Sequence, residues 1–296
     1  MNRRAILGSF AAALLLSAAA AVGVGRLAAN SPASAGPRFV SLTPAITETL
    51  LAIGGAAHLV AVSNYCQLPA NLKLPRVGSS LTPSYEAIAG LRPSLIFSDD
   101  SAGAKHRELG AIAHCEILPW LTLHDVVQST RRLGKLVEQS QAADALALKL
   151  ETRLSRVPPV AAPRVLLLLS YDPDRPAELW FIRQNSLHGA ALAAAGARNA
   201  VSRDVPGLPR LSAEELLKLD PDQVLIIQPP GATLEHKREM LKAFSALAPL
   251  RAVKENAFGI VNGTQSVGPS ILQFVDALEH VLQRMTQPRP AGGIVD

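Results

Sequence analysis

The sequence predicts an α/β protein in which two lobes, each built on a parallel β-sheet, are joined by a long helix. Short apolar runs alternate with segments of helical periodicity through most of the 296 residues, a pattern typical of parallel sheets covered by helices. The pattern restarts at Arg164 with the continuous apolar run RVLLLLS, which suits a buried parallel strand. Between the two halves lies a stretch with helical periodicity and no strand pattern.

The first half contains four or five predicted strands. They include the runs RFVSL, HLVAVS, SLIFSD and EILPW. A helix is expected after Thr43-Pro44 and should end near Ile53, before Gly54-Gly55. In the second half we expect strands at Trp180-Phe181-Ile182, QVLIIQ and AFGIVN, and a last helix over about residues 270–285. Each half is therefore predicted to be a Rossmann-like lobe.

The connector is predicted to be helical. Thr122 and Asp125 have the spacing of a capping box. Ser140 can cap a second helix that ends before Pro158-Pro159 and spans about 25 Å at about 1.5 Å per residue. The predicted boundaries are an N-terminal lobe at 36–139, a connecting helix at 140–157 and a C-terminal lobe at 158–296. A helix of this length is expected to form a stiff joint between the lobes.

The first 35 residues are predicted to be a signal peptide. MNRR is followed by an apolar run over 5–25 and by Ala33-Ser34-Ala35, which suits cleavage near Ala35 and export to the periplasm. The Arg3-Arg4 pair partly matches a twin-arginine signal, so the twin-arginine and general secretory routes both stay open. An uncleaved membrane anchor is the structural alternative, because the run is long enough to span a bilayer.

Charge and cysteine content narrow the function classes. Without the leader, 26 basic residues face 24 acidic ones, so no basic excess supports nucleic-acid binding. Cys66 and Cys115 could pair in an oxidising compartment. Their predicted places at opposite edges of one sheet favour two free thiols, and both alternatives stay open.

One motif occurs twice, 128 residues apart. SYEAIAGLRP at 84–93 and SAEELLKLDP at 212–221 both read SxExxxxLxP before an apolar run. The serine can cap a helix, the leucine can pack inward and the proline can end the helix. Glu86 and Glu214 fit a first helical turn, where a carboxylate favours the helix dipole. Because one such carboxylate recurs in each lobe, the pair also suits two basic sockets on a symmetric partner.

The chain resembles the periplasmic substrate-binding proteins of ABC importers for cobalamin and ferric siderophores, the rigid two-lobed class joined by one helix. The resemblance covers roughly 38–283 and rests on RFVSLTPAITETLLAIGG, LVAVSNYCQLP, LPRVGSSLTPSYEAIAGLRPSLIFSDD, LHGAALAAAGARNAV and SAEELLKLDPDQVLII. It implies that Glu86 and Glu214 dock onto arginines of the importer's membrane-spanning dimer. It also implies a monomer that works with that dimer and its ATPase.

The resemblance further implies a ligand between the lobes, at the carboxyl ends of the strands. Predicted ligand contacts are the aromatic and basic residues expected there: Tyr65, Trp120, Tyr171, Trp180 and Arg183. Amphipathic rings suit a large planar or macrocyclic metal chelate. Trp120 and Trp180 could instead be structural. For a heme ligand, Tyr65 and His188 are the candidates to reach the iron. The motifs do not identify the ligand.

These patterns predict a binding protein that captures a corrinoid or an iron chelate for an ABC importer, with no catalytic residues, no resident metal and no cofactor. A zinc or manganese importer component is one alternative, but it needs several converging His, Asp or Glu residues, and the seven histidines are scattered. An exported enzyme with an active site between the lobes is the other. No GxSxG, HExxH, Walker or strand-linked GxGxxG motif supports it.

Overall fold

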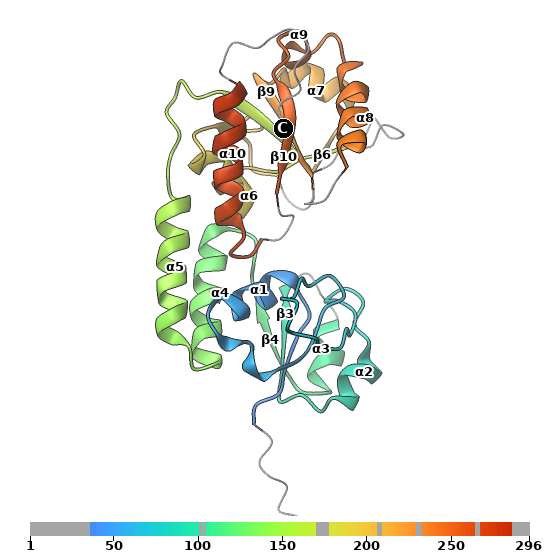
Figure 1. Ribbon diagram of the computed structural model, residues 1–296, viewed down its shortest axis with the longest axis vertical. Coiled ribbons are helices and arrows are strands. Elements are labelled where there is room, and N and C mark those ends of the chain that lie inside the picture. Colours follow the sequence, from blue (N-terminus) through green and yellow to red (C-terminus); the bar gives the residue numbers. More distant parts are fainter. Residues whose placement is uncertain are drawn as a thin grey trace, which may run out of the picture. The chain divides into compact units, whose positions relative to one another are not determined.

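The computed structural model describes residues 36–100, 103, 105–169, 178–205, 209–228, 233–263 and 267–285 (Figure 1). The predicted signal peptide at 1–35, Tyr171 and the loop at 264–266 lie outside these ranges. From Pro37 onward the chain forms one compact unit. No described helix is long and apolar enough to cross a bilayer.

The first sheet is parallel, with strand order β2-β1-β3-β4. Its strands are β1 (Phe39–Ser41), β2 (Leu59–Val62), β3 (Leu95–Asp99) and β4 (His114–Leu118). Around it lie α1 (Pro44–Ala52), the 3-10 turn η1 (Gly55–His58), α2 (Tyr85–Gly90) and α3 (Lys105–Gly110). Helix α1 starts as predicted, because Thr43 Oγ1 accepts the Ile46 N–H and Pro44 occupies the first turn.

The second sheet repeats this plan, with order β10-β9-β5-β7 and all strands parallel. Its strands are β5 (Arg164–Leu168), β7 (Arg198–Asn199), β9 (Gln223–Gln228) and β10 (Phe258–Asn262). Its helices are α6 (Leu187–Ala194), α7 (Ala213–Leu219), α8 (Leu234–Ser245), α9 (Arg251–Lys254) and α10 (Ile271–Met285). The run predicted at Trp180-Phe181-Ile182 instead supplies β6 (Leu179–Trp180), which pairs antiparallel with β8 (Arg210–Leu211) outside the main sheet.

Two helices side by side form the connector, α4 (Leu123–Leu136) and α5 (Ser140–Leu154) (Figure 1). The predicted capping box at the start of α4 is confirmed: Thr122 Oγ1 accepts the Asp125 N–H, and Asp125 Oδ2 accepts the Thr122 N–H. Ser140 was expected to cap α5, and this is wrong: the preceding Gln139 is the N-cap residue and makes no side-chain cap. Helix α5 ends at Leu154, three residues before the predicted boundary.

The two copies of the repeated motif differ at their serines. Ser212 forms a full capping box with Glu215, the residue after Glu214. Ser84 makes no side-chain cap, so that part of the prediction is wrong. Its backbone lies outside the extended region that N-cap residues favour, with ψ at 89°, and its N–H donates to the Val77 carbonyl. The leucines of both copies pack against a core.

One hydrophobic core continues through both lobes. It includes Phe39 beside the first sheet, Val126 of α4, Leu150 of α5, Leu167 of the second sheet and Phe274 of α10. Because buried apolar side chains of both sheets and of the connector belong to this one cluster, separating the lobes would expose it to water. This continuous core confirms the two-lobed plan and gives the joint a physical basis for stiffness.

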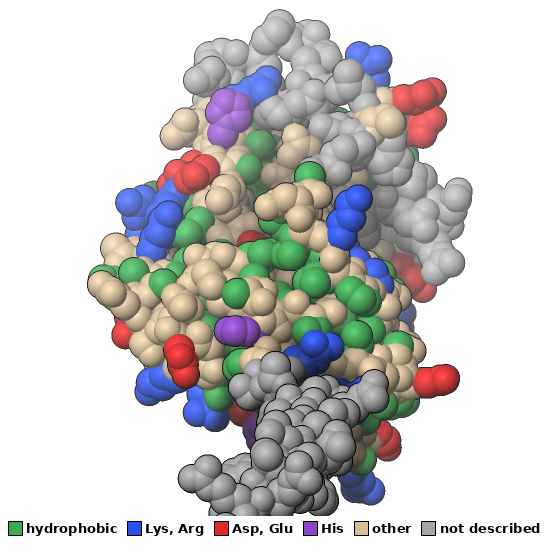
Figure 2. All heavy atoms as spheres, turned by 60° about the horizontal axis from the view of Figure 1, so that its bottom comes forward, with side chains coloured by type: hydrophobic (Ala, Val, Ile, Leu, Met, Phe, Trp, Pro, Cys, Tyr) green, Lys and Arg blue, Asp and Glu red, His purple; other side chains and the backbone are tan. Residues whose placement is uncertain are grey.

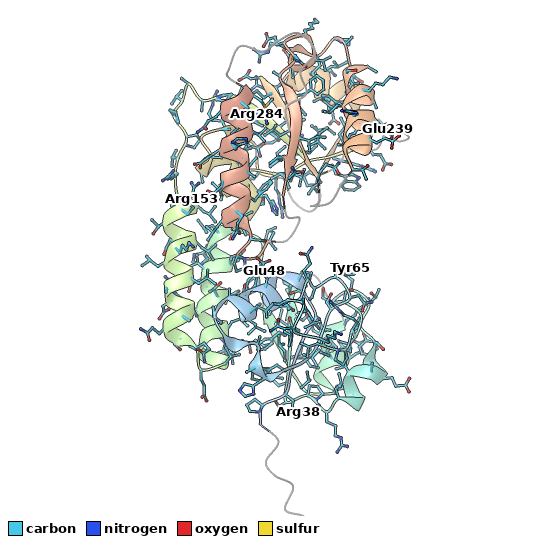
Figure 3. The ribbon with its side chains drawn as sticks, viewed as in Figure 1. Arg38, Glu48, Tyr65, Arg153, Glu239 and Arg284 are labelled. Atoms are coloured by element: carbon cyan, nitrogen blue, oxygen red, sulfur yellow. The ribbon has the colours of Figure 1, made fainter. Side chains whose placement is uncertain are left out.

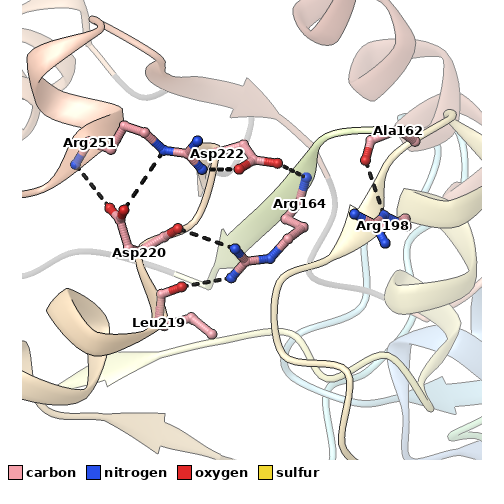
Figure 4. Close-up of polar contacts among 7 residues, drawn as sticks. All are labelled: Ala162, Arg164, Arg198, Leu219, Asp220, Asp222 and Arg251. Atoms are coloured by element: carbon pink, nitrogen blue, oxygen red, sulfur yellow. Dashed lines mark hydrogen bonds and ion pairs between the residues drawn. The ribbon is translucent and has the colours of Figure 1, made fainter. Parts of the chain in front are cut away.

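A charged network closes the amino end of the second sheet (Figure 4). Asp222 accepts the Arg164 backbone N–H at 2.7 Å and a hydrogen bond from the Arg251 guanidinium. Asp220 accepts the Arg251 N–H, while the Arg164 guanidinium donates to the Leu219 carbonyl at 2.6 Å. Burial alone would raise the pKa of Asp222, but these hydrogen bonds outweigh it and hold that pKa below its ordinary value.

Asp222→Asn should therefore flatten the acid dependence of stability. A carboxylate with a lowered folded-state pKa stabilises the fold above its unfolded pKa of about 3.9, and that contribution is lost as the pH falls through the folded value. We expect the variant to lose about 1–2 kcal/mol of unfolding free energy at pH 7 and to be less sensitive to pH below about 4. Urea unfolding at several pH values measures both. Asp144→Asn, which removes an exposed acid near Arg131, is the control, and equal acid dependence in the wild type and Asp222→Asn would contradict this reading.

Candidate functional site

The strand order places a candidate site at one edge of each sheet. In the order β2-β1-β3-β4, the connection from β1 to β2 runs toward one edge of the sheet and the connection from β3 to β4 runs toward the other. The direction reverses in the same way between β5 and β9 in the second sheet. Ligands of open parallel sheets bind outside the carboxyl ends of the strands at such a reversal. Figure 3 shows Tyr65 and Glu48 at this edge of the first lobe and Arg38, which precedes β1, at the opposite edge.

The side-chain hydroxyl groups at the end of β1 and in α1 form hydrogen bonds with one another. Thr47 Oγ1 donates to Ser41 Oγ at 2.8 Å, and the Cys66 thiol donates to Thr47 Oγ1 at 3.1 Å. Burial raises the pKa of the Cys66 thiol. Burial together with Glu116 raises the pKa of Cys115 to about 11. Both cysteines are free, and the strands beside them, β2 and β4, are the opposite edges of the first sheet as expected. These side chains therefore have a structural role at this edge. With raised pKa values, both cysteines are thiols rather than thiolates at neutral pH.

Tyr65 stands on a loop that is fixed from both sides. Its N–H donates to Ser63 Oγ, and the Arg76 guanidinium donates to the Ser63 and Cys66 carbonyls at 2.8 and 2.6 Å. Asn64 also exchanges hydrogen bonds with Gly78. The Tyr65 side chain is nevertheless 72% exposed. A large ring on a fixed backbone is an effective ligand contact, because little conformational entropy is lost when it binds.

Leu81 and Leu121 add exposed apolar area to loops of the first lobe. Leu81 lies in a tight loop that needs a glycine at position 78. Gly78 has a φ of 89°, and a Cβ on it would lie 2.2 Å from the Thr82 carbonyl oxygen. Leu121 follows Trp120, beyond the carboxyl end of β4. Neither leucine is predicted from the sequence, because an apolar residue in a loop carries no pattern that separates a ligand contact from a core residue.

Trp120 joins the lobes and is hardly accessible. Its side chain is 5% exposed, and its indole N–H donates to the Val267 carbonyl, before α10, at 2.9 Å. The next carbonyl, of Leu121, accepts the Leu187 N–H at the start of α6. This geometry favours the structural alternative for Trp120 over ligand contact.

Glu48 of α1 caps the start of α10. Its carboxylate accepts the Ser270 N–H and, at 3.1 Å, the Ser270 hydroxyl. Figure 3 shows Glu48 beside the end of α10 that is nearer the first lobe. The Glu48 carboxylate lies close to Gly268, and a Cβ at that position would be 2.4 Å from Glu48 Oε2. A carboxylate at a helix N-terminus satisfies unpaired N–H groups and complements the dipole. No sequence pattern predicts this contact, because Glu48 and Ser270 are 222 positions apart.

The predicted contacts of the second lobe lie around β6. Trp180 is half-buried, and the Arg210 guanidinium carbon lies 5.9 Å from the centre of its ring, within cation–π range. Arg183 is also half-buried and donates to the Val205 carbonyl at 2.9 Å. Tyr171 lies outside the described residues. The structure thus places Trp180 and Arg183 in one short segment, beside Arg210, which pairs with Glu178 at 3.9 Å.

Glu86 and Glu214 are both exposed, each in the first turn of its helix. Glu214 also pairs with Lys218 at 2.7 Å, an exposed contact that contributes about 0.3–0.5 kcal/mol. His188, by contrast, is buried, and its ring packs edge-on against Phe274. Within the described ranges, no three His, Cys, Asp or Glu side chains gather as metal ligands would. On the face drawn in Figure 2, basic and acidic side chains are interspersed.

The fold and this edge define a two-lobed α/β binding protein. The chain belongs to the periplasmic binding protein family, whose profile matches residues 39–259. It is 28% identical over 200 residues to the vitamin B12-binding protein of Pectobacterium carotovorum, across 64% of this chain and 70% of that protein.

Solved structures agree with this assignment. The chain is similar to a periplasmic heme-binding protein from Pseudomonas aeruginosa, with a TM-score of 0.68, 26% identity and coverage of 86% of this chain and 95% of that one. The siderophore-binding protein of Vibrio cholerae with bound Fe³⁺-Desferal shares the fold, with a TM-score of 0.65, 19% identity and coverage of 84% and 98%. The family consists of binding proteins, which agrees with the fold.

Trp120→Phe should destabilise the junction between the lobes. Phenylalanine keeps an aromatic ring but leaves the part-buried Val267 carbonyl without its donor, so we expect a loss of about 0.5–1.5 kcal/mol of unfolding free energy. Chemical unfolding measured by circular dichroism tests this, with Trp180→Phe in the half-buried β6 as the matched control. A larger loss in the control than in Trp120→Phe would contradict the structural role.

Proposed function

We propose that this protein is the periplasmic substrate-binding component of an ABC importer and that it carries a corrinoid or an iron chelate between its lobes. The predicted leader at 1–35 would deliver it to the periplasm. No bond is made or broken in this process, and the importer's ATPase supplies the energy. The observation that carries the ligand site is Tyr65, a highly exposed ring on a loop fixed by Ser63, Asn64 and Arg76.

Exposed apolar residues on these loops support the proposed ligand class. Tyr65, Leu81 and Leu121 offer broad apolar contact from the first lobe, which suits a large ring system rather than a bare ion. The similar proteins are named for vitamin B12 and heme, both large metal-containing macrocycles. This supports a ligand of that kind, with a ferric siderophore as the remaining member of the class.

The second lobe would supply the opposite contacts. Trp180 and Arg183 combine an aromatic surface with a cation, whereas the charge of Arg210 is offset by its ion pair with Glu178. Carboxylate or phosphate groups at the rim of a chelate would pair with such guanidinium groups. We therefore assign ring contact to Tyr65 and recognition of rim charge to Arg183.

Delivery would use Glu86 on α2 and Glu214 on α7. Each lies on a different lobe, is exposed and extends from a first helical turn. Two such carboxylates suit a partner with two equivalent basic sites, as the two-fold symmetric membrane dimer of an importer would offer. Their role is docking, so they should not affect the affinity for the ligand.

Titration with cyanocobalamin, hemin and ferrioxamine B, followed by tryptophan fluorescence, tests the ligand site. We expect tight 1:1 binding of one of these compounds, weakened by more than about 1 kcal/mol in Tyr65→Ala and in Trp180→Ala. Tyr65→Phe should keep the affinity if the ring stacks and lose it if the phenol coordinates iron. Leu148→Ala, which trims another exposed apolar residue on α5, is the control. No binding of any compound, or equal binding by Tyr65→Ala, would contradict the site.

Charge reversal tests docking. The double variant Glu86→Arg, Glu214→Arg should abolish ligand uptake by proteoliposomes that contain the importer and leave ligand affinity within about twofold. The matched control is Glu108→Arg with Glu235→Arg, which reverses one exposed first-turn glutamate in each lobe on α3 and α8. A similar loss of uptake in both double variants would show a general charge effect and sink the docking assignment.

A further inference from the structure

The covalent link to the second lobe does not by itself hold that lobe in place. The chain passes from α5 to β5 once, through residues 155–163. No helix or strand forms within this segment, and its Val157 and Val160 are 88% and 86% exposed. A segment with so few buried contacts bends at low energetic cost. The position of the second lobe therefore depends on contacts between groups that are distant in the sequence.

Two polar contacts hold α10 from opposite sides. On the side of the connector, the Arg153 guanidinium donates to the carboxylates of Asp276 at 3.0 Å and Glu279 at 2.8 Å. On the side of the ligand edge, Glu48 accepts the Ser270 N–H and, at 3.1 Å, the Ser270 hydroxyl. Figure 3 shows Arg153 on the connector and Glu48 beside the end of α10 that is nearer the first lobe. Helix α10 is thus held both along its length and at its start.

The Glu48 contact lies where it can control the separation of the lobes. Glu48 belongs to α1 of the first lobe, whereas α10 packs against α6 and β10 of the second, so the start of α10 cannot move away from Glu48 without moving the second lobe. Trp120 and Leu121 add neutral hydrogen bonds at the same junction. Hydrogen bonds to a carboxylate are roughly twice as strong as neutral ones, so Glu48 makes the strongest polar contact on the side of the ligand edge.

The Glu48 carboxylate also occupies the space beside Gly268. A Cβ at position 268 would collide with Glu48 Oε2, so an alanine there would push the carboxylate away from Ser270. Glu48 is half-buried, and a carboxylate at a helix N-terminus satisfies N–H groups that have no partner within the helix. If this contact broke, the Arg153 ion pairs on the far side of α10 would remain as a pivot for the second lobe.

We propose that Glu48 is a positioning residue for ligand retention, because its cap on α10 holds the two halves of the ligand site at the separation that the ligand needs. This inference rests on the proposed function, since it concerns a ligand held between Tyr65 of the first lobe and Trp180 and Arg183 of the second. With the cap in place the halves are preorganised, and less entropy is lost on binding. Without it the second lobe pivots, and the affinity falls with the fraction of molecules that are still competent to bind.

Electron–electron double resonance between two spin labels measures the separation of the lobes. Labels on p-acetylphenylalanine at positions 108 and 239, exposed sites of α3 and α8, leave both cysteines unchanged. We expect a narrow distance distribution in the otherwise unchanged chain and a broader one with a longer mean in Glu48→Ala. Gly268→Ala should give the same change, because its Cβ displaces the carboxylate. Glu48→Gln should keep the narrow distribution, because an amide can accept the Ser270 N–H and donate to the Ser270 hydroxyl.

Titration with cyanocobalamin, hemin and ferrioxamine B relates this separation to ligand retention. For the compound that the wild type binds, Glu48→Ala should weaken the affinity by about fivefold, the size of effect expected when a helix cap is lost. Glu48→Gln should stay within about twofold of the wild type. The matched control is Ser212→Ala, which removes a helix cap inside the second lobe and should change neither the distances nor the affinity.

Three results would overturn the proposal: unchanged distances in Glu48→Ala, an equal change in Ser212→Ala, or a widened separation with unchanged affinity. If Glu48→Ala does not fold, Gly268→Ala decides by the same criteria. If none of the three compounds binds to the wild type, the proposed ligand class fails, and the distances alone then decide whether Glu48 positions the lobes. The two failures are therefore distinguishable.

Discussion

The capping of α10 by Glu48 is the contact on which the arrangement of the lobes depends. A helix needs partners for its first N–H groups, and here a carboxylate from the other lobe provides one for a 15-residue helix. Since α10 packs into the core shared by both sheets, moving Glu48 would uncover both a helix end and apolar surface. Trp120 and Leu121 add hydrogen bonds to the segments before α10 and at the start of α6. The junction is therefore a set of mutually dependent contacts.

The contacts between the lobes bear on what the proposed ligand site must provide. A protein that closes by a hinge can gather its ligand contacts during closure, whereas a stiff one must present them already in place. The loop of Tyr65 meets this requirement for its backbone, which is hydrogen-bonded on both sides, while the ring itself stays in solvent. Gly78 does the same for Leu81, since only glycine fits its left-handed backbone and close contact with Thr82. Preorganisation in these loops reduces the entropy lost on binding.

Local patterns predicted the fold well because they depend on neighbours in the sequence. The strand runs, the start of α1 at Thr43 and the capping box at Thr122 all follow from residues within a few positions of one another. The junction was beyond such reasoning: the donor and acceptor in the Trp120 contact are 147 positions apart, and Glu48 and Ser270 are 222 apart. From the sequence alone, a tryptophan such as Trp120 indicates an aromatic contact. Only the fold shows that its indole N–H already donates to the Val267 carbonyl.

The repeated motif illustrates how structure separates architecture from function. In the second copy the capping box uses Glu215, so Glu214 is not needed to start its helix. In the first copy Ser84 makes no cap, yet a first-turn glutamate is still present at Glu86. Within the described residues Glu86 forms no ion pair, and the exposed pair of Glu214 with Lys218 contributes little. The proline and leucine are explained by burial and packing, whereas both glutamates remain in solvent. A carboxylate without a structural task at the same place in each lobe is what a two-point docking surface requires.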